Sequence, residues 1–479
     1  MKQFAVLFFC LTSLTTINAQ TPLQHCWNKQ LKPVQKKHIT FSFSEKRNEL
    51  EHSFEPWQQT TYEVQGTVWA NATEFIRRDT LSLRGRAYPS KTDFTEDYLL
   101  FIPYGRNELQ EVSKENFQDL TFKTARYSPL HIIHYFMENK AKESSESNEQ
   151  FTIYEKKVNQ TQVKLYIRKT DFLVEKVSLL QYDELFGDVT TTIRYQYAEK
   201  QDDLFFPQKV EIEKLNGKVK DEVIINHISL AKKKPEKLKK PKGYAFVEEE
   251  KVRTEVKVEQ YNEHLHFVEL KHTDDRVLIV EFTDFLVVAE APLNSENGEL
   301  ILQEARKIAP NKPVKYFVFG HYHPHYIGGM RPFVQSGAKI ICSDVNEAYA
   351  RHLAEASHKL KPDALQKNPK PIQVEKIEDK LTITDGNFIM EIYFIGEKSE
   401  HTKDYLVYYF PQEKILFQDD LVWIKKEGEI KKAGKRQAGL YNAIVDLGIE
   451  VETIVQSWPV SNRGVKTIIP FADLEASMK

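Results

Sequence analysis

Residues Phe317 to Gly329 read FVFGHYHPHYIGG, and this stretch decides how the rest of the chain is interpreted. An apolar strand runs directly into three alternating histidines, His321, His323 and His325, and a pair of glycines follows. Two histidines one residue apart at a strand end can aim both imidazoles at one point, and imidazole is the commonest metal ligand in proteins. The spacing therefore predicts a metal site at the end of this strand.

Strands and helices alternate around this stretch, from about Tyr244 to the C-terminus. Helical spacing over Glu299–Ile308 precedes the strand at Val314–Gly320, and Asn346–His358 is helical again before a strand at Ile389–Ile395. Interleaved strands and helices of these lengths indicate a layered α/β arrangement. The second half of the chain is therefore expected to be a folded unit of its own.

The first half has a different pattern, in which short strand-like runs follow one another. Thr61–Ala70, Gln162–Arg168 and Thr190–Tyr197 alternate apolar with polar residues, as half-buried antiparallel strands do. Leu173–Tyr182 and Asp188–Ala198 are joined by a short turn and predict a hairpin. The whole chain is thus expected to be α+β with two domains, of which the first is mostly one curved antiparallel sheet.

The chain ends and junctions predict the boundaries of these units. Lys2, the apolar run from Phe4 to Ile17 and the small residue Ala19 are typical of a signal peptide over residues 1–19. A β-rich N-terminal domain follows over 20–231, then a Lys/Pro-rich linker over 232–251, and the second domain over 252–479. Because no later segment is long and apolar enough to span a bilayer, we expect an exported protein, periplasmic or secreted.

Length and composition narrow the possible functions. The 479 residues are too many for one ordinary core, and 41% hydrophobic residues suffice for two. The 67 Lys plus Arg nearly balance the 69 Asp plus Glu, so the charge gives no argument for nucleic-acid binding. Beyond the signal peptide only Cys26 and Cys342 remain, which predicts two unpaired thiols and no disulfide framework.

From about Val252 onward, the sequence resembles the metallo-β-lactamase superfamily. Members of that family carry a His-x-His pair with an Asp-His pair before two glycines, then a lone histidine, a strand-ending aspartate and a final histidine. In this chain His321 and His323 match the first pair, His401 the lone histidine, and Asp420 the strand-ending aspartate; Gly328-Gly329 matches the glycine pair. Glu290-Ala291-Pro292 also resembles a subset of the family. The resemblance implies an αββα sandwich with a metal site at the edge between its two sheets.

The chain departs from the family pattern at three positions, all of which belong to the second metal site in two-metal members. His325 and Tyr326 stand where the family has the Asp-His pair, and Trp458 stands where the final histidine is expected. The indole of tryptophan offers only an N–H donor, and the phenol of tyrosine ionises only near pH 10. The second metal site is therefore expected to be lost.

The resemblance implies one zinc ion held by His321, His323 and His401, with water or Asp420 as the fourth ligand. Asp420 is then a ligand or a carboxylate that orients water, and His325 a base or accessory ligand. The expected activity is metal-dependent hydrolysis of a small ester, thioester, lactone or related compound.

Three alternatives stay open at this point. The site could have drifted and hold no metal, or it could be a rebuilt two-metal site. The protein could also be an inactive family member that binds a ligand or partner, through the same cleft or through an N-terminal sheet similar to those of periplasmic lipid carriers. The sequence carries no signal for the oligomeric state.

Overall fold

The structure is a computed structural model that describes residues 20–35, 37–50, 53–95, 98–102, 108–111, 121–198, 204–246, 253–461 and 463–479. The predicted signal peptide, residues 1–19, lies outside the described residues. Within the described part of the chain, no helix combines the length and apolar character that a membrane span needs. Helices and strands are mixed along the chain, so the predicted α+β class is confirmed.

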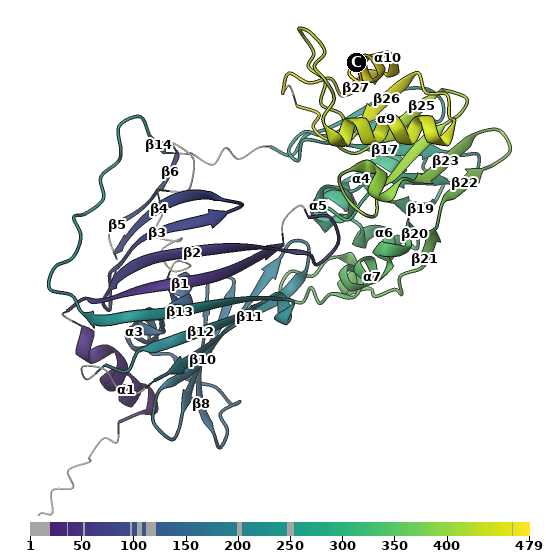
Figure 1. Ribbon diagram of the computed structural model, residues 1–479. Helices are drawn as coiled ribbons and strands as arrows, with labels where there is room; N and C mark the ends of the chain where they lie inside the picture. The colour runs from purple at the N-terminus through teal and green to yellow at the C-terminus, as the bar shows by residue number, and fades with distance from the viewer. Residues whose placement is uncertain are drawn as a thin grey trace, which may run out of the picture.

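One large sheet makes up most of the N-terminal half, residues 20–246 (Figure 1). Its described strands follow the order β14-β6-β5-β4-β3-β2-β1-β13-β12-β11-β10-β9-β8-β7, and neighbours pair antiparallel except β14 with β6. The strands are β1 (Ile39–Leu50), β2 (Gln59–Ala70), β3 (Phe75–Leu83), β4 (Arg86–Thr95), β5 (Tyr98–Ile102), β6 (Glu108–Glu111), β7 (Lys142–Glu143), β8 (Phe151–Val158), β9 (Thr161–Arg168), β10 (Val174–Asp183), β11 (Gly187–Tyr197), β12 (Pro207–Lys214), β13 (Val219–Leu230) and β14 (Ala245–Phe246). Strand β14 falls within the stretch 232–251 that the sequence marks as a linker.

Alternating burial along these strands is the reason that they form a one-sided core. In β1, Phe41 and Phe43 are buried while their neighbours are not, because successive side chains point to opposite faces. The predicted hairpin is present as β10 and β11. At its turn, the Asp183 side chain accepts hydrogen bonds from the backbone N–H groups of Leu185 and Phe186. Phe186 of this turn packs against Tyr349 and His352 of the C-terminal half.

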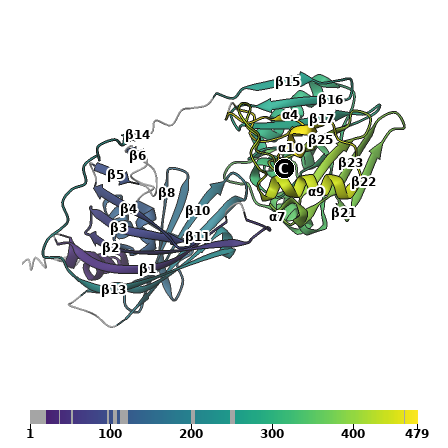
Figure 2. The same cartoon turned by 45° about the horizontal axis from the view of Figure 1, so that its top comes forward.

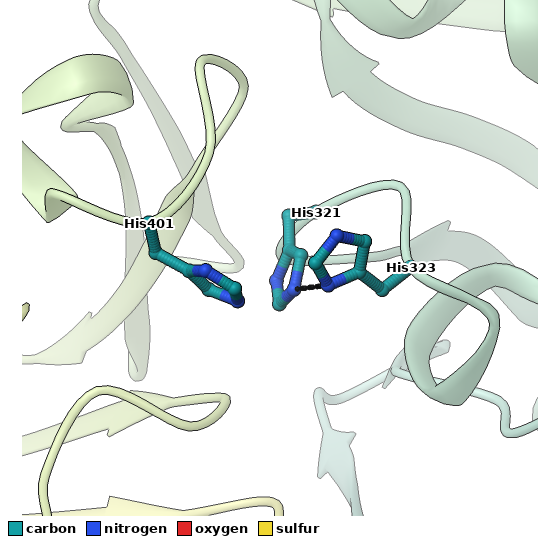
Figure 3. A group of neighbouring side chains, drawn as sticks. All are labelled: His321, His323 and His401. Carbon is teal, nitrogen blue, oxygen red and sulfur yellow. Dashed lines mark hydrogen bonds between the residues drawn. The ribbon is translucent and has the colours of Figure 1, made fainter. Parts of the chain in front are cut away.

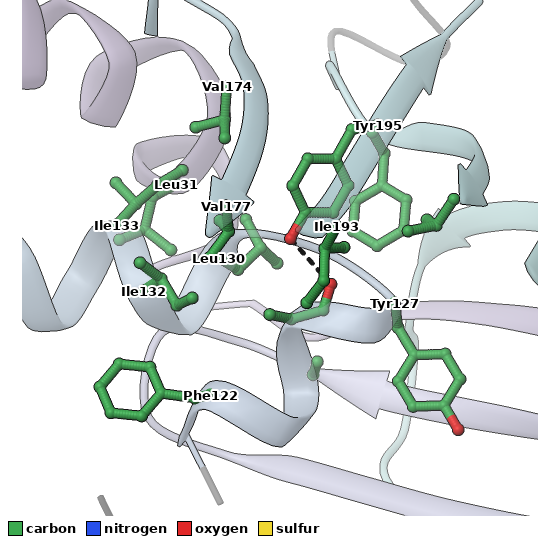
Figure 4. Close-up of a cluster of buried hydrophobic side chains, with 14 of the residues drawn as sticks. Leu31, Phe122, Tyr127, Leu130, Ile132, Ile133, Val174, Val177, Ile193 and Tyr195 are labelled. Atoms are coloured by element: carbon green, nitrogen blue, oxygen red, sulfur yellow. Dashed lines mark hydrogen bonds between the residues drawn. The ribbon is translucent and has the colours of Figure 1, made fainter. Parts of the chain in front are cut away.

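Helices cover one face of the N-terminal sheet and fill its core (Figure 4). They are α1 (Pro22–Cys26), with the short turns after it, and α3 (Leu130–Glu138). Leu130, Ile132 and Ile133 of α3 are fully buried together with Val177 of β10. Tyr195 of β11 donates a hydrogen bond to the Ala125 carbonyl at 2.8 Å. The protein's own side chains therefore fill the face of the sheet that the helices cover.

The C-terminal half, residues 253–479, contains two further sheets with a shared apolar core. Leu265 and Val318 from the first sheet pack with Ile392 and Phe417 from the second, and all four are buried. In chain order, the strands of the first sheet are β15 (Val256–Gln260), β16 (Leu265–Leu270), β17 (Asp275–Glu281), β18 (Leu286–Ala289), β19 (Val314–Val318), β20 (Lys339–Ser343) and β21 (Val374–Ile377). Those of the second are β22 (Lys380–Thr384), β23 (Ile389–Phe394), β24 (Leu406–Phe410), β25 (Ile415–Gln418), β26 (Thr453–Gln456) and β27 (Ile468–Pro470).

Each of these two sheets also packs against helices through a separate apolar cluster. On the first sheet these are α4 (Ser295–Ile308), α6 (Arg331–Ser336) and α7 (Glu347–Glu355), with the short α5 (Pro324–Ile327) and α8 (Ala364–Lys367) nearby. On the second sheet they are α9 (Lys435–Leu447) and α10 (Phe471–Ala476). Strands β18, β19 and β20 run parallel and are mostly buried, as strands covered on both faces are.

Candidate metal centre

The three predicted histidine ligands come together at the end of the first C-terminal sheet. His321 and His323 lie in the turn that follows β19, and His401 lies in the segment before β24. Their exposed fractions are 0%, 1% and 7%. One ring nitrogen from each lies within 4.8 Å of the others, and Figure 3 shows the rings gathered around a common point. Among the described residues, this is the group of His, Cys, Asp or Glu side chains able to surround a metal ion.

Gly320, two residues beyond the end of β19, explains how the turn can place His321 so close to the second sheet. A Cβ atom on Gly320 would lie 2.1 Å from Oδ2 of Asp419, a residue just beyond β25. Only a residue without a side chain fits at that approach. Gly328 of the predicted glycine pair must also lack a side chain, because a Cβ there would lie 2.5 Å from the Leu293 carbonyl.

His321 and His323 each have an inner ring nitrogen, which faces the other histidine, and an outer one, which faces away. Each outer nitrogen faces a hydrogen-bond acceptor. His321 Nδ1 lies 2.6 Å from Asp419 Oδ2, and both groups are fully buried. His323 Nε2 lies 3.2 Å from the backbone carbonyl of Ser53, in the N-terminal half. A carbonyl cannot donate, so a hydrogen bond to it places the His323 proton on Nε2. The Asp419 carboxyl group likewise accepts from His321 Nδ1, which places the His321 proton on Nδ1.

The inner nitrogens of this pair, His321 Nε2 and His323 Nδ1, lie 2.9 Å apart. Figure 3 marks this contact as a hydrogen bond, in which one of the two nitrogens must carry a proton; with both outer nitrogens protonated and the rings neutral, the two inner nitrogens instead present lone pairs to each other. Two lone pairs at that distance repel unless a cation or a proton lies between them. Metal-ligating histidines in proteins show the same pattern, with the far N–H held by a carboxylate or a carbonyl. The donor set fits a metal ion.

His401 and Asp420 complete the predicted ligand set on the other side. His401 Nε2 is buried and makes no aligned hydrogen bond, and Asp420 Oδ2 lies 3.2 Å from it. Asp420 also lies 3.6 Å from the Arg436 guanidinium. Burial raises the pKa of Asp420, but His401 and Arg436 outweigh burial and hold that pKa below its ordinary value. Asp420 is therefore an ionised carboxylate beside the histidine group, although the mutually close set comprises the three histidines alone.

The positions where the chain departs from the family pattern also lie at this site. His325 Nδ1 is 3.0 and 3.1 Å from the two carboxylate oxygens of Asp275, the first residue of β17. Burial lowers the pKa of His325, but Asp275 outweighs burial and raises that pKa above its ordinary value. The Tyr326 ring packs 4.4 Å from the His321 ring, and burial raises its pKa well above 10. The Trp458 ring lies 5.9 Å from the His325 ring.

Sequence reasoning missed several residues that support the histidines. The family motif points to Asp420, whereas Asp419, the other half of the strand-ending Asp-Asp pair, is the carboxyl group that contacts His321. Glu290, noted only as part of a motif, is fully buried and accepts hydrogen bonds from Gly320 N at 3.0 Å and from Tyr408. Burial raises the pKa of Glu290 to about 8 and that of Asp419 well above its ordinary value. Burial is the main cause for both groups, and the nearby charge of Glu290 adds to the rise in the pKa of Asp419.

No protein-family model matches the chain, and no curated protein matches it. Solved structures similar to it include a metallo-β-lactamase from Pontibacter korlensis, at 19% identity and a TM-score of 0.35 over 47% of this chain and 97% of that one. The DIM-1 metallo-β-lactamase has 17% identity and a TM-score of 0.34 over 47% and 95%. FIM-1 from Pseudomonas aeruginosa, in its mono-zinc form, has 18% identity and a TM-score of 0.34 over 47% and 93%. Each of these three structures is matched over 47% of this chain and over more than nine-tenths of its own length.

Proposed function

We propose that residues 252–479 form an αββα metallo-β-lactamase domain that binds one zinc ion and hydrolyses a small molecule. The substrate class is an ester, thioester, lactone or related compound. The observation that carries this proposal is the convergence of the inner nitrogens of His321 and His323, with their outer nitrogens held by Asp419 and the Ser53 carbonyl. His401 Nε2, buried beside them, supplies a third nitrogen for a tetrahedral site.

The number of metal ions follows from the residues at the second position. Tyr326 is neutral at physiological pH, and the Trp458 indole has no lone pair to offer. His325, the remaining group there, is already bonded through Nδ1 to Asp275. One ion rather than two is therefore the state that this donor set supports.

The chemistry divides between the ion and the chain. A zinc ion bound by three neutral imidazoles supplies the Lewis acidity that makes water a nucleophile near neutral pH. Asp420, which is ionised, either completes the ligand set or orients the attacking water. His325 stands where the family has an aspartate, and Asp275 fixes its ring by bonding Nδ1, so that Nε2 can accept a proton from that water. The buried carboxyl pair of Asp419 and Glu290 holds His321 in place.

Export is part of this proposal and rests on the sequence of residues 1–19. The apolar run and the small residue before Gln20 have the form of a cleaved signal peptide. A periplasmic or secreted enzyme would then meet its small-molecule substrate outside the cytoplasm.

An inactive, ligand-binding descendant is the competing function. Its proposed lipid-carrier face on the N-terminal sheet has little support, because α3 and the neighbouring turns pack their own apolar side chains there. The convergence of His321, His323 and His401 likewise favours a metal-dependent enzyme over an inactive ligand-binding protein.

Zinc content of the exported, purified protein tests the proposal. After growth with added zinc, we expect about one equivalent in the wild-type protein and less than about a tenth in His321→Ala, because three ligands are needed for a stable site. His227→Ala, a change of an exposed histidine on β13, is the matched control and should keep its zinc. Turnover of a panel of esters, thioesters and lactones should disappear with a chelator and return with zinc. A wild-type protein with less than a tenth of an equivalent, unchanged by His321→Ala, would sink the proposal.

A further inference from the structure

We infer that the turn between β1 and β2 of the N-terminal sheet, residues 53–58, is a working part of the metal centre and sets its affinity for zinc. This inference rests on the proposed function, and it assigns these residues, called the tip below, a positioning role. Figures 1 and 2 show this end of the sheet directed toward the C-terminal half. The tip makes contacts with both of the segments that carry the histidines.

The first contact is with the His-x-His turn itself. The Ser53 carbonyl accepts hydrogen bonds from the Tyr322 hydroxyl at 2.7 Å and from His323 Nε2 at 3.2 Å. Ser53 is 270 residues away from His323 in the sequence. Since a carbonyl can only accept, it keeps the His323 proton on Nε2 and leaves the Nδ1 lone pair directed at His321. The tip therefore selects the form of His323 that can bind a metal.

The second contact is with the segment that carries His401. The backbone N–H of Lys403 donates to the Phe54 carbonyl at 2.8 Å, and Lys403 Nζ lies 3.6 Å from Glu55 Oε2. Lys403 is only two residues beyond His401, so the tip ties the two ligand segments together. The two segments also bond to each other directly, through Tyr322 N–H to Asp404 Oδ2 at 2.8 Å and Leu406 N–H to the Gly320 carbonyl at 2.7 Å, so the tip adds a further link between them.

Trp57 anchors the tip to the C-terminal half. Its ring lies 5.3 Å from that of Tyr349 and 4.8 Å from that of His352, both in α7, and it stacks on Phe186 of the β10–β11 turn at 5.5 Å. Trp57 has a φ of 66°, a conformation that strains a residue with a bulky side chain. Packing on three sides holds Trp57 in this conformation, which indicates a fixed docking point.

The neighbouring β10–β11 turn docks beside the tip and reinforces it. Asp188 accepts hydrogen bonds from the backbone N–H groups of Lys359 at 2.7 Å and Leu360 at 3.0 Å, and from the Ser357 hydroxyl at 2.8 Å. These charge-assisted bonds are about twice as strong as neutral ones. The N-terminal sheet thus reaches the C-terminal half through two adjacent turns, one of which carries the carbonyl that faces His323.

Trp57→Ala in the full chain tests the role of the tip, with Trp57→Phe as the conservative variant. Hydrogen exchange of the Lys403 amide reports docking without any metal, and competition with a chelator reports the zinc dissociation constant. We expect Trp57→Ala to speed hydrogen exchange of the Lys403 amide and to raise the zinc dissociation constant about tenfold or more. This is the usual effect of losing a partner of a metal-bound histidine. Cobalt-loaded Trp57→Ala should show an altered visible spectrum, and Trp57→Phe should restore all three readouts. Tyr261→Ala, which removes an exposed aromatic side chain, is the control and should change neither.

Glu55→Lys provides a second test if Trp57→Ala unfolds, because Glu55 is exposed and a lysine there would repel Lys403. Glu55→Lys should raise the zinc dissociation constant about threefold through like-charge repulsion. Glu149→Lys, the same change on an exposed loop, should leave the constant unchanged. Faster exchange of the Lys403 amide with unchanged zinc affinity would overturn this inference but leave the proposed function standing. Unchanged Lys403 exchange in Trp57→Ala, which would mean that the tip stays docked, would do the same. A wild-type chain that binds no zinc would overturn the proposed function and this inference with it.

Discussion

At the scale of single residues, the site depends on which nitrogen of each histidine carries the proton. The sequence identifies His321, His323 and His401, because their spacing and order match a known motif. It does not identify the groups that fix their rings. Asp419 lies 98 residues from His321 in the chain, and the partner of His323 is a backbone carbonyl, which leaves no mark in a sequence. Ligands can thus be predicted from pattern, whereas their supporting groups require the folded chain.

Asp419→Asn tests the support of His321. The amide keeps the shape of the carboxyl group but is a weaker hydrogen-bond acceptor for His321 Nδ1, so the His321 ring should be less firmly oriented and less basic. We expect zinc affinity to fall about 10- to 100-fold, measured by chelator competition. Asp379→Asn, the same change at an exposed position, should leave affinity unaltered. Equal affinities for the two variants would show that Asp419 does not act on the metal site.

At the scale of elements, the strands and helices near the site were predictable because burial enforces their periodicity. The expected helix over 299–308 is α4, which begins earlier at Ser295, where Asn294 caps it by accepting from the Asn297 N–H. The expected strand over 314–320 ends at Val318, because the chain turns there to carry the histidines. Departures from pattern thus fall at caps and turns, where single hydrogen bonds decide the boundary.

Gly320 is the element boundary with the sharpest consequence. A methyl group at Gly320 would enter the Asp419 carboxylate, so Gly320→Ala should push β19 and the Asp-Asp segment apart. We expect a loss of about 1–3 kcal/mol in the free energy of unfolding, the range for overpacking a tight site. Ser145→Ala is the control, since Ser145 lies in an exposed turn, and it should stay within about 0.5 kcal/mol. Urea denaturation measures both, and similar values would contradict the packing described.

At the scale of the whole molecule, the sequence predicts a β-rich first half and a layered second half but not their contact. The two turns that join the halves use backbone carbonyls, one tryptophan and one aspartate, and no motif distinguishes these from ordinary turn residues. The charge balance of the chain is also uninformative here, because the ionic contacts that matter are buried pairs rather than a net charge. Assembly of the site across both halves is therefore a property visible only in the fold.

Buried charge pairs also set how the molecule responds to acid. Burial raises the pKa of Glu45, but Arg126 and Arg47 outweigh burial and lower that pKa to about 2. A carboxyl group with a lowered pKa in the folded state stabilises the fold above about pH 4.5, and this contribution is lost as the pH falls toward 2. The free energy of unfolding of the N-terminal half should therefore decline across this window. In Glu45→Gln the decline should be shallower, and an identical pH profile would contradict the assignment.

X-ray absorption at the zinc edge of the loaded, full-length protein tests the central claim most directly. We expect one zinc ion per chain with three imidazole nitrogens at about 2.0–2.1 Å and one or two oxygen donors. In His401→Ala the imidazole contribution should fall by one ligand if the ion is retained at all. A spectrum without the imidazole pattern, or one with a second metal about 3.5–4 Å away, would contradict a single zinc ion held by His321, His323 and His401.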